Sequence, residues 1–178
     1  MGETNIFLIG PMGVGKTTIG RHLARTLDLE FIDSDHEIEE RTGADIPWIF
    51  DIEGEEGFRE RERQTISELV KQQGIVLATG GGAVLDPDSR ADLKRYGVVV
   101  YLKASVKRLL QRTAKDRQRP LLQTASPRQQ LEKILAEREP LYLELADIIV
   151  DTEKRNVSNS VNYIIQQVKT LSGSGGGE

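Results

Sequence analysis

Short apolar runs alternate along this chain with longer segments whose apolar residues recur at helical spacing. Three of the runs, at residues 6–9, 75–78 and 98–102, have the length and unbroken apolar character of strands buried on both faces. A helix is predicted to begin near Thr17, where the period of the apolar residues changes. Because parallel strands need long crossovers, this alternation predicts an α/β fold: a parallel sheet with helices on both faces.

The remaining segments extend this pattern over most of the chain. Further strands are predicted at residues 30–33 and 148–150, and further helices at 36–41, 45–73, 87–96, 105–113, 127–142 and 157–171. The 45–73 segment is expected to break near Gly54 or Gly57, and Gly43, Ser126 and Asn156 are expected helix caps. We predict a single domain over residues 1–171 and a flexible tail, rich in Gly and Ser, over 172–178.

Charge and composition exclude several classes of function. The 178 residues include 24 Lys and Arg against 28 Asp and Glu, a net charge of −4, whereas coating nucleic acid needs a basic surplus. No apolar run approaches the ~20 residues of a membrane helix, and no targeting signal is visible. Cysteine is absent, which excludes disulfides and thiolate metal sites. We therefore expect a cytoplasmic protein that binds neither nucleic acid nor a membrane.

A glycine-rich loop between the first strand and the first helix carries the clearest chemical signal. Residues 10–17, Gly-Pro-Met-Gly-Val-Gly-Lys-Thr, match the phosphate-loop pattern G-x-x-x-x-G-K-[ST]. In such a loop, backbone N–H groups turn toward phosphate oxygens, Lys16 reaches the β and γ oxygens, and Thr17 can ligate magnesium. The chain lacks the Asn-Lys-x-Asp motif that recognises guanine, so ATP is favoured over GTP.

Two aspartates follow the strand at 30–33. Asp33 and Asp35 have alternate spacing, so both face one side in extended backbone, where one can serve the metal and the other the acceptor of a phosphoryl group. A simpler alternative is that Asp35 or Ser34 only caps the next helix. Asp151, which follows the strand at 148–150, is a rival metal carboxylate, although its late position favours Asp33.

The other candidate site residues are a run of three glycines, two arginines and a basic segment. Gly80, Gly81 and Gly82 follow the strand at 75–78 and leave bare backbone where α/β sheets bind ligands, unless they only form a wide turn. Arg59 and Arg138, taken alone, read as solvated surface arginines. Residues 103–119 hold seven basic residues and one acidic residue, which suits either a mobile lid over phosphates or a solvated face.

Six ordered motifs together resemble the shikimate kinase family over about residues 5–171. Besides the phosphate loop, they are Phe-Ile-Asp-Ser-Asp, Gly-Glu-Glu-Gly-Phe-Arg, Ala-Thr-Gly-Gly-Gly, Arg-Pro-Leu-Leu and Glu-Arg-Glu-Pro-Leu-Tyr. The resemblance implies a P-loop NTPase core like that of nucleoside monophosphate kinases, with five parallel strands in the order 2-3-1-4-5. It also implies a mobile lid at about 113–124, a substrate-binding helical region at about 34–62 and, as we expect, a monomer.

The resemblance also implies the reaction. The family transfers the γ-phosphoryl group of ATP, with Mg²⁺, to the 3-hydroxyl of shikimate, giving shikimate 3-phosphate and ADP in chorismate and aromatic amino-acid biosynthesis. Two alternatives stay open: another small-molecule kinase of the same architecture, such as a gluconate or nucleotide kinase, and a nucleotide-binding regulator without transfer activity. The paired aspartates and the basic segment argue against a regulator, which needs no acceptor site.

Site residues carry over from the family by motif. Asp35 matches the residue at the substrate hydroxyls, Arg59 and Arg138 match those at its carboxylate, and Glu62 is expected to hold Arg59. Phe50 and Phe58 look like an apolar wall beside the substrate, with Trp48 nearby. The remaining assignments are ring lining by Gly80, Gly81 and Gly82; ATP binding by Gly13, Val14, Gly15, Lys16, Thr17, Thr18, Arg112, Arg119 and Arg155; metal binding by Thr17 and Asp33; and catalysis by Asp35, Lys16 and Arg119.

Overall fold

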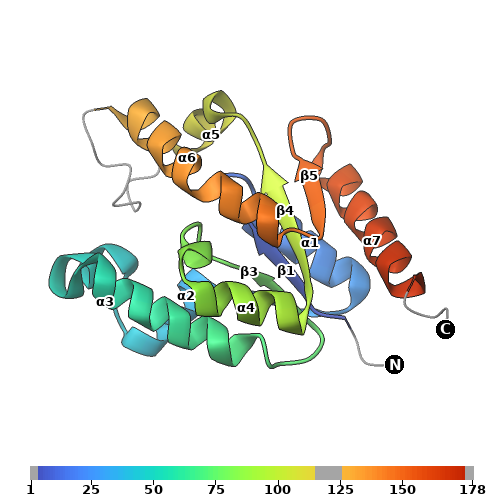
Figure 1. Ribbon diagram of the computed structural model, residues 1–178, viewed down its shortest axis with the longest axis horizontal. Helices are drawn as coiled ribbons and strands as arrows, with labels where there is room; N and C mark the ends of the chain where they lie inside the picture. The colour runs from blue at the N-terminus through green and yellow to red at the C-terminus, as the bar shows by residue number, and fades with distance from the viewer. Residues whose placement is uncertain (1–3, 115–125, 175–178) are drawn as a thin grey trace.

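The predicted strands form one parallel sheet in the order β2-β3-β1-β4-β5, which confirms the order that the resemblance implied. The structure is a computed structural model that describes residues 4–114 and 126–174 (Figure 1). Central β1 pairs with both β3 and β4, so that Ile6 lies opposite Val76 and Val98. The strands are β1 (Ile6–Ile9), β2 (Glu30–Asp33), β3 (Ile75–Ala78), β4 (Val98–Lys103) and β5 (Ile148–Asp151).

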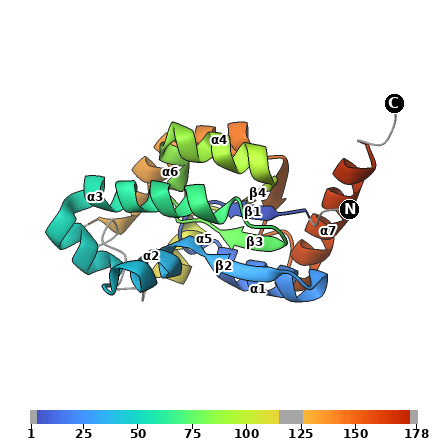
Figure 2. The ribbon, with the colours of Figure 1, turned by 90° about the horizontal axis from the view of Figure 1, so that it is seen from below.

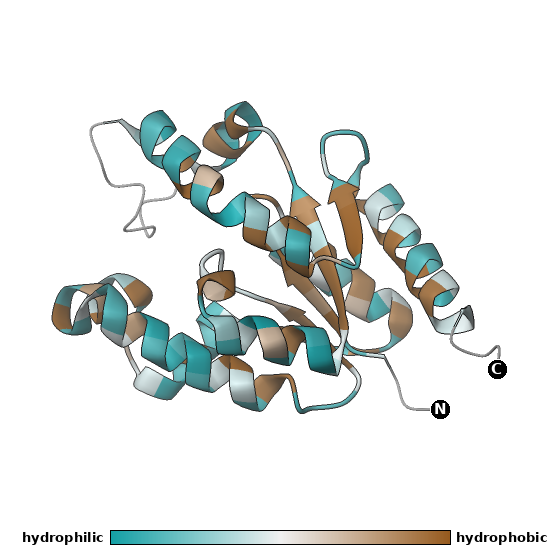
Figure 3. Cartoon of the chain, viewed as in Figure 1, coloured by the Kyte–Doolittle hydropathy of each residue, from teal (hydrophilic) through white to brown (hydrophobic). Residues whose placement is uncertain are grey.

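Helices cover both faces of this sheet. They are α1 (Lys16–Leu27), α2 (Ser34–Thr42), α3 (Ile46–Leu69), α4 (Pro87–Tyr96), α5 (Val106–Thr113), α6 (Pro127–Leu145) and α7 (Val157–Gly173), with a 3-10 turn, η1 (Ala83–Leu85). On one face α1, α5 and α7 pack on side chains such as Leu8 and Val100, and on the other α3, α4 and the end of α6 pack on Phe7 and Val99 (Figure 2). The strands are the most apolar part of the fold (Figure 3).

The element boundaries follow local chemistry. The break in α3 falls at Gly54, whose φ of 73° and ψ of 176° are not helical. Gly43 ends α2 in the left-handed conformation, and the Asn156 side chain caps α7 by accepting from Asn159 N at 2.7 Å, as predicted. Ser126 stands at the cap position of α6, but its side chain makes no capping hydrogen bond, contrary to expectation.

Some elements differ in length from the prediction. Helix α6 continues through Pro140 to Leu145, and α7 reaches Gly173, inside the segment predicted as a tail. The turn η1 was not predicted. Within the two described ranges, no helix is long and apolar enough to cross a membrane.

The carboxyl ends of β1, β2 and β3 lead into the phosphate loop, the Asp33–Asp35 turn and the glycine run, respectively. Because these strands are neighbours in the sheet, the three segments meet at one edge. A smaller apolar cluster of Ile38, Ile49 and Phe58 joins α2 to α3 beside that edge.

Candidate active site

The phosphate loop leads into the start of α1 and lies at one end of a cleft of about 580 Å³. Gly15 stands at the N-cap position with a φ of 104°, a left-handed conformation that favours glycine. Lys16 Nζ folds back onto the loop and donates to the carbonyl oxygens of Gly10 at 2.5 Å and Pro11 at 2.9 Å. The loop residues Gly13, Val14, Gly15, Lys16, Thr17 and Thr18 all line the cleft.

Asp33 joins the phosphate loop to the next segment of the site. Its Oδ2 accepts from Thr17 Oγ1 at 3.0 Å, and its Oδ1 accepts from the backbone N–H groups of Asp35 at 2.9 Å and His36 at 3.3 Å. Asp33 is therefore the side chain that caps α2, and the alternative in which Asp35 or Ser34 serves as the cap is wrong. Asp151, the rival metal carboxylate, instead accepts from Glu153 N in the turn after β5.

The glycine run forms the floor on which charged side chains from distant segments meet. A Cβ added to Gly80 would lie 2.7 Å from both Asp35 Oδ1 and Glu62 Oε2. The corresponding atom on Gly81 would lie 3.4 Å from Arg138 Nη1, and that on Gly82 would lie 2.5 Å from Arg59 Nη1. We call Gly80, Gly81 and Gly82 the glycine floor. Because these residues have no side chains, two acids and two arginines can approach the backbone here. The alternative in which the run only forms a wide turn does not account for this convergence.

The glycine floor is tied to both neighbouring strands. The backbone N–H and the hydroxyl of Thr79 both donate to Leu8 O, at 3.1 and 3.0 Å, which fixes the start of the floor to β1. Gly80 N donates to Ser34 Oγ at 3.1 Å, and Ser34 is fully buried. The floor therefore keeps a fixed position relative to the turn that carries Asp35. This role of Ser34 was missed, because sequence spacing does not reveal a hydrogen bond between segments so far apart.

Glu62 and Arg59 form an ion pair on α3 that reaches the floor. Arg59 Nη1 donates to Glu62 Oε1 at 2.9 Å, and a second, longer contact of 3.4 Å joins Arg59 Nη2 to Glu55 Oε1. The Glu62 side chain is 4% exposed and that of Arg59 is 21% exposed. Burial raises the pKa of the Glu62 carboxyl, against the opposing attraction of Arg59 and Arg138. The expectation that Glu62 holds Arg59 agrees with this geometry.

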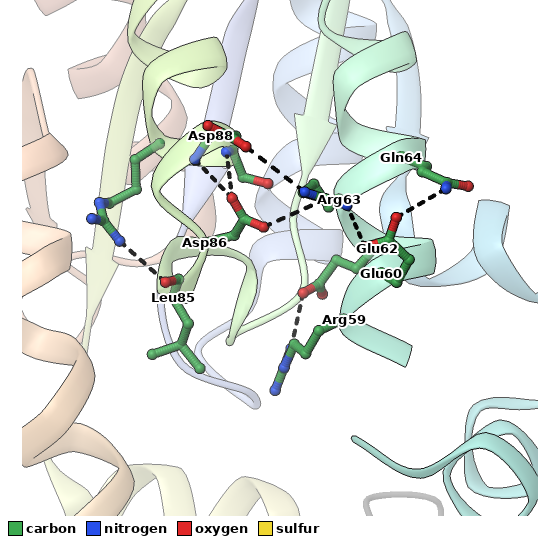
Figure 4. A network of polar contacts seen from close by, with 10 residues as sticks. Arg59, Glu60, Glu62, Arg63, Gln64, Leu85, Asp86 and Asp88 are labelled. Atoms are coloured by element: carbon green, nitrogen blue, oxygen red, sulfur yellow. Dashed lines mark hydrogen bonds and ion pairs between the residues drawn. The ribbon is translucent and has the colours of Figure 1, made fainter. Parts of the chain in front are cut away.

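A second polar network beside this pair fixes α3 to the start of α4. Arg63 lies between Glu60, to which it donates, and the carboxylates of Asp86 and Asp88, each 3.8 Å away (Figure 4). Asp86 caps α4 by accepting from Asp88 N at 2.7 Å. Because α4 begins just after the glycine floor and η1, this network joins the helix carrying Arg59 to the segment that follows the floor.

The environment of Arg138 differs from the one expected for this residue when its sequence surroundings are taken alone. Its side chain lies in α6 and is 4% exposed, so the reading as a solvated surface arginine is wrong. Its guanidinium lies against Gly81. Phe50 and Phe58, the expected apolar wall, stack with their ring centroids 4.9 Å apart on the α3 side, whereas Trp48 is 53% exposed.

The expected adenine-flanking arginines lie on the phosphate-loop side of the cleft, where Arg112 contacts the loop itself. Arg112 Nη1 donates to Val14 O at 2.8 Å, and burial together with nearby Arg108 lowers the pKa of Arg112. The Arg155 guanidinium lies 3.9 Å from the ring centroid of Tyr163. Both arginines line the cleft. Arg119 and nearly all of the expected lid at 113–124 lie outside the described residues.

Comparisons with known proteins agree with this site. The family model described as shikimate kinase matches residues 12–169. Proteins named shikimate kinase from Shewanella denitrificans and Vibrio cholerae are 57% and 56% identical, over 93% and 94% of this chain and 97% and 96% of theirs. A shikimate kinase from Acinetobacter baumannii, solved in complex with shikimate, superposes with a TM-score of 0.92 at 50% identity, covering 95% of this chain and 94% of that one. This chain belongs to the shikimate kinase family.

Proposed function

We propose that this chain transfers the γ-phosphoryl group of ATP to the 3-hydroxyl of shikimate, giving shikimate 3-phosphate and ADP in aromatic amino-acid biosynthesis. The observation that carries the proposal is the glycine floor, on which Asp35, Arg59, Glu62 and Arg138 converge. Asp35, Gly80 and Gly81 also line the cleft that begins at the phosphate loop. An acceptor with one carboxylate and several hydroxyls matches two arginines and a nearby aspartate. Gluconate kinases share the architecture, but the gluconokinase from Sinorhizobium meliloti is 15% identical at a TM-score of 0.58, which supports the fold alone.

On the nucleotide side, the backbone N–H groups of the phosphate loop hold the phosphates and the N-terminus of α1 favours their charge. Lys16 leaves the Gly10 and Pro11 carbonyls and pairs with the β and γ oxygens. Thr17 and Asp33 would hold Mg²⁺, because their side-chain oxygens already lie 3.0 Å apart and oxygen donors suit this ion. The ion, when bound, neutralises charge on the β and γ oxygens. Arg112 and Arg155 flank the adenine, and Arg119 meets the phosphates from the lid.

On the acceptor side, Arg59 and Arg138 bind the carboxylate with their planar guanidinium groups and so fix the ring over the glycine floor. Asp35 accepts a hydrogen bond from the 3-hydroxyl, whose oxygen forms a bond to the γ-phosphorus as the bond to the β,γ-bridging oxygen breaks. The hydroxyl proton passes to Asp35, and ADP leaves with the bridging oxygen. Because the transition state is loose, orientation of the hydroxyl contributes more than early removal of its proton.

An acceptor panel tests the proposal. Purified protein with MgATP is assayed by coupled ADP detection with shikimate, gluconate, nucleoside monophosphates or no acceptor. We expect ADP release that depends on shikimate. Release with gluconate or a nucleotide instead would assign the chain to another kinase class, and ATP binding without transfer to any acceptor would favour a nucleotide-binding regulator.

We further infer a monomeric, cytoplasmic enzyme whose single domain spans residues 1–171, with a lid at about 113–124 that closes over the nucleotide. The support is the continuous sheet, the absence of cysteine and the basic character of residues 103–119. Sedimentation of the purified protein with and without both substrates tests the monomer, and protection of the 113–124 segment from proteolysis by the substrates tests closure.

A further inference from the structure

A buried tyrosine contacts the glycine floor from the side of α6. Tyr142 is fully buried, and its hydroxyl donates to the carbonyl oxygen of Gly81, the central residue of the floor, at 2.5 Å. Tyr142 lies one helical turn after Arg138, so the two side chains share a face of α6. The same hydroxyl therefore stands beside the group proposed to bind the substrate carboxylate.

Arg138 and Tyr142 meet at Gly81. The Tyr142 hydroxyl donates to the Gly81 carbonyl oxygen, and Arg138 Nη1 lies 3.4 Å from the position of a Cβ on the same residue. The positive charge of Arg138 lowers the pKa of Tyr142, against the larger effect of burial. Arg138 Nε is buried and has no hydrogen-bond partner within the described part of the chain. Because Nε has no such partner, the guanidinium plane depends on what packs around the terminal nitrogens beside Gly81.

We propose that Tyr142 is a positioning residue, whose hydroxyl fixes the Gly81 carbonyl and the Arg138 guanidinium relative to each other and so sets the affinity for the acceptor carboxylate. The inference rests on the proposed function, because it concerns the carboxylate end of the same acceptor. A bidentate arginine contact depends on the angle of the guanidinium plane, so a phenol that holds this plane acts on substrate binding without touching the substrate.

The neighbouring Tyr101 provides a matched control. Its ring centroid is 5.0 Å from that of Tyr142 and it is equally buried, but its hydroxyl donates to Glu139 Oε2, at 3.2 Å, instead of to the floor. Burial raises the pKa of Tyr142 to about 12, although Arg138 opposes the shift, so its hydroxyl keeps the donated proton throughout an ordinary assay range.

The test compares Tyr142→Phe with Tyr101→Phe. We expect Tyr142→Phe to raise the KM for shikimate about fivefold to thirtyfold, since the Gly81 carbonyl and the Arg138 guanidinium are then no longer fixed relative to each other and part of the binding free energy is spent on ordering them. The KM for ATP should stay within about twofold, and the shikimate effect should not change between pH 7 and pH 9. Tyr101→Phe should leave the KM for shikimate unaltered. An unchanged KM in Tyr142→Phe, or equal shifts in both variants, would overturn the positioning role.

A double-mutant cycle supplies a second measurement. If Tyr142 acts through Arg138, then Tyr142→Phe should weaken shikimate binding much less in an Arg138→Lys background than in the unmodified chain, as measured by calorimetry. Additive effects of the two substitutions would contradict the proposal. Failure of the proposed function can be told apart from failure of the positioning role. If the proposed function is wrong, the unmodified protein itself releases no ADP in response to shikimate.

Discussion

The two ends of the active-site cleft are built in opposite ways. The phosphate-loop end consists mainly of backbone from one continuous segment, residues 10–17, and its charge comes from Lys16, from the start of α1 and from Arg112 beside the loop. The acceptor end consists of side chains from α2, α3 and α6 that reach the glycine floor, and two of its four ionic groups, Glu62 and Arg138, are buried. A triphosphate is bound largely by peptide N–H groups of one glycine-rich loop, whereas a hydroxylated carboxylic acid needs particular side chains at particular angles.

This difference has a consequence for energetics. In the acceptor end, Glu62 and Arg138 are each at most 4% exposed, so their charges are costly to leave without partners. In the phosphate-loop end, Lys16 rests on backbone carbonyls that it can exchange for phosphate oxygens. Substitutions in the two ends should therefore impair different steps: nucleotide binding and turnover at one end, acceptor binding at the other.

The largest expected effect is at the phosphate loop. Lys16→Met should lower kcat by ~10²-fold to 10³-fold or more, because the charge developing on the transferred group loses its closest protein cation. Shikimate affinity, measured by calorimetry without nucleotide, should remain within about twofold, because the side chains of the acceptor end do not include Lys16. A variant that loses shikimate affinity in parallel with kcat would show that the two ends are not independent.

At the acceptor end, Gly80→Ala should weaken shikimate binding by about tenfold to hundredfold, since an overpacked site costs ~1–3 kcal/mol. The added methyl group would lie 2.7 Å from carboxylate oxygens of Asp35 and Glu62, so one of these acids must move. ATP affinity should not change. Calorimetric titration with each substrate in turn makes the comparison.

Gly43→Ala is the matched control for that substitution. Gly43 has a φ of +70° with no atom within 4 Å of an added Cβ, so alanine there strains the backbone without touching the site. We expect a loss of about 1 kcal/mol in the free energy of unfolding and unchanged affinities. Equal losses of shikimate affinity in Gly80→Ala and Gly43→Ala would contradict a role of the glycine floor in shikimate binding.

The smallest expected effect is a change in how stability depends on pH. Burial raises the pKa of Glu62 above its ordinary value of 4.5, so the folded state binds this proton more tightly than the unfolded state does. The stabilisation that this tighter proton binding gives is fully present below pH 4.5 and is lost as the pH rises through the folded-state pKa. Glu62→Gln cannot titrate, so its stability should fall less over this range. Urea unfolding at several pH values measures the slope, and parallel slopes for variant and parent would contradict the assignment.

The same contrast explains what the sequence could predict. The phosphate loop and the strands are local features: a contiguous motif and unbroken apolar runs identify them, and the sheet places them as expected. The acceptor end is non-local. Burial of Arg138 and the contacts of Ser34 and Tyr142 follow from packing between segments far apart in the chain.

Resemblance to a family supplied what pattern could not: the strand order, the substrate and the arginines at its carboxylate. The structure adds the physical reason, because it shows which bare glycine each charged group approaches. Details of helix ends, such as Asp33 acting as the cap of α2 in place of its neighbours, depend on hydrogen-bond geometry that sequence preference alone does not distinguish.

The most direct test of the central claim, that both ends act on one phosphoryl transfer, is the steady-state rate of Asp35→Asn with saturating MgATP and shikimate, measured beside ATP affinity. Asparagine keeps the shape of the side chain but removes the charge that we propose orients the acceptor hydroxyl and takes its proton. We predict that turnover falls by at least about 10²-fold while ATP affinity is unchanged. A variant that keeps most of its turnover would contradict the account.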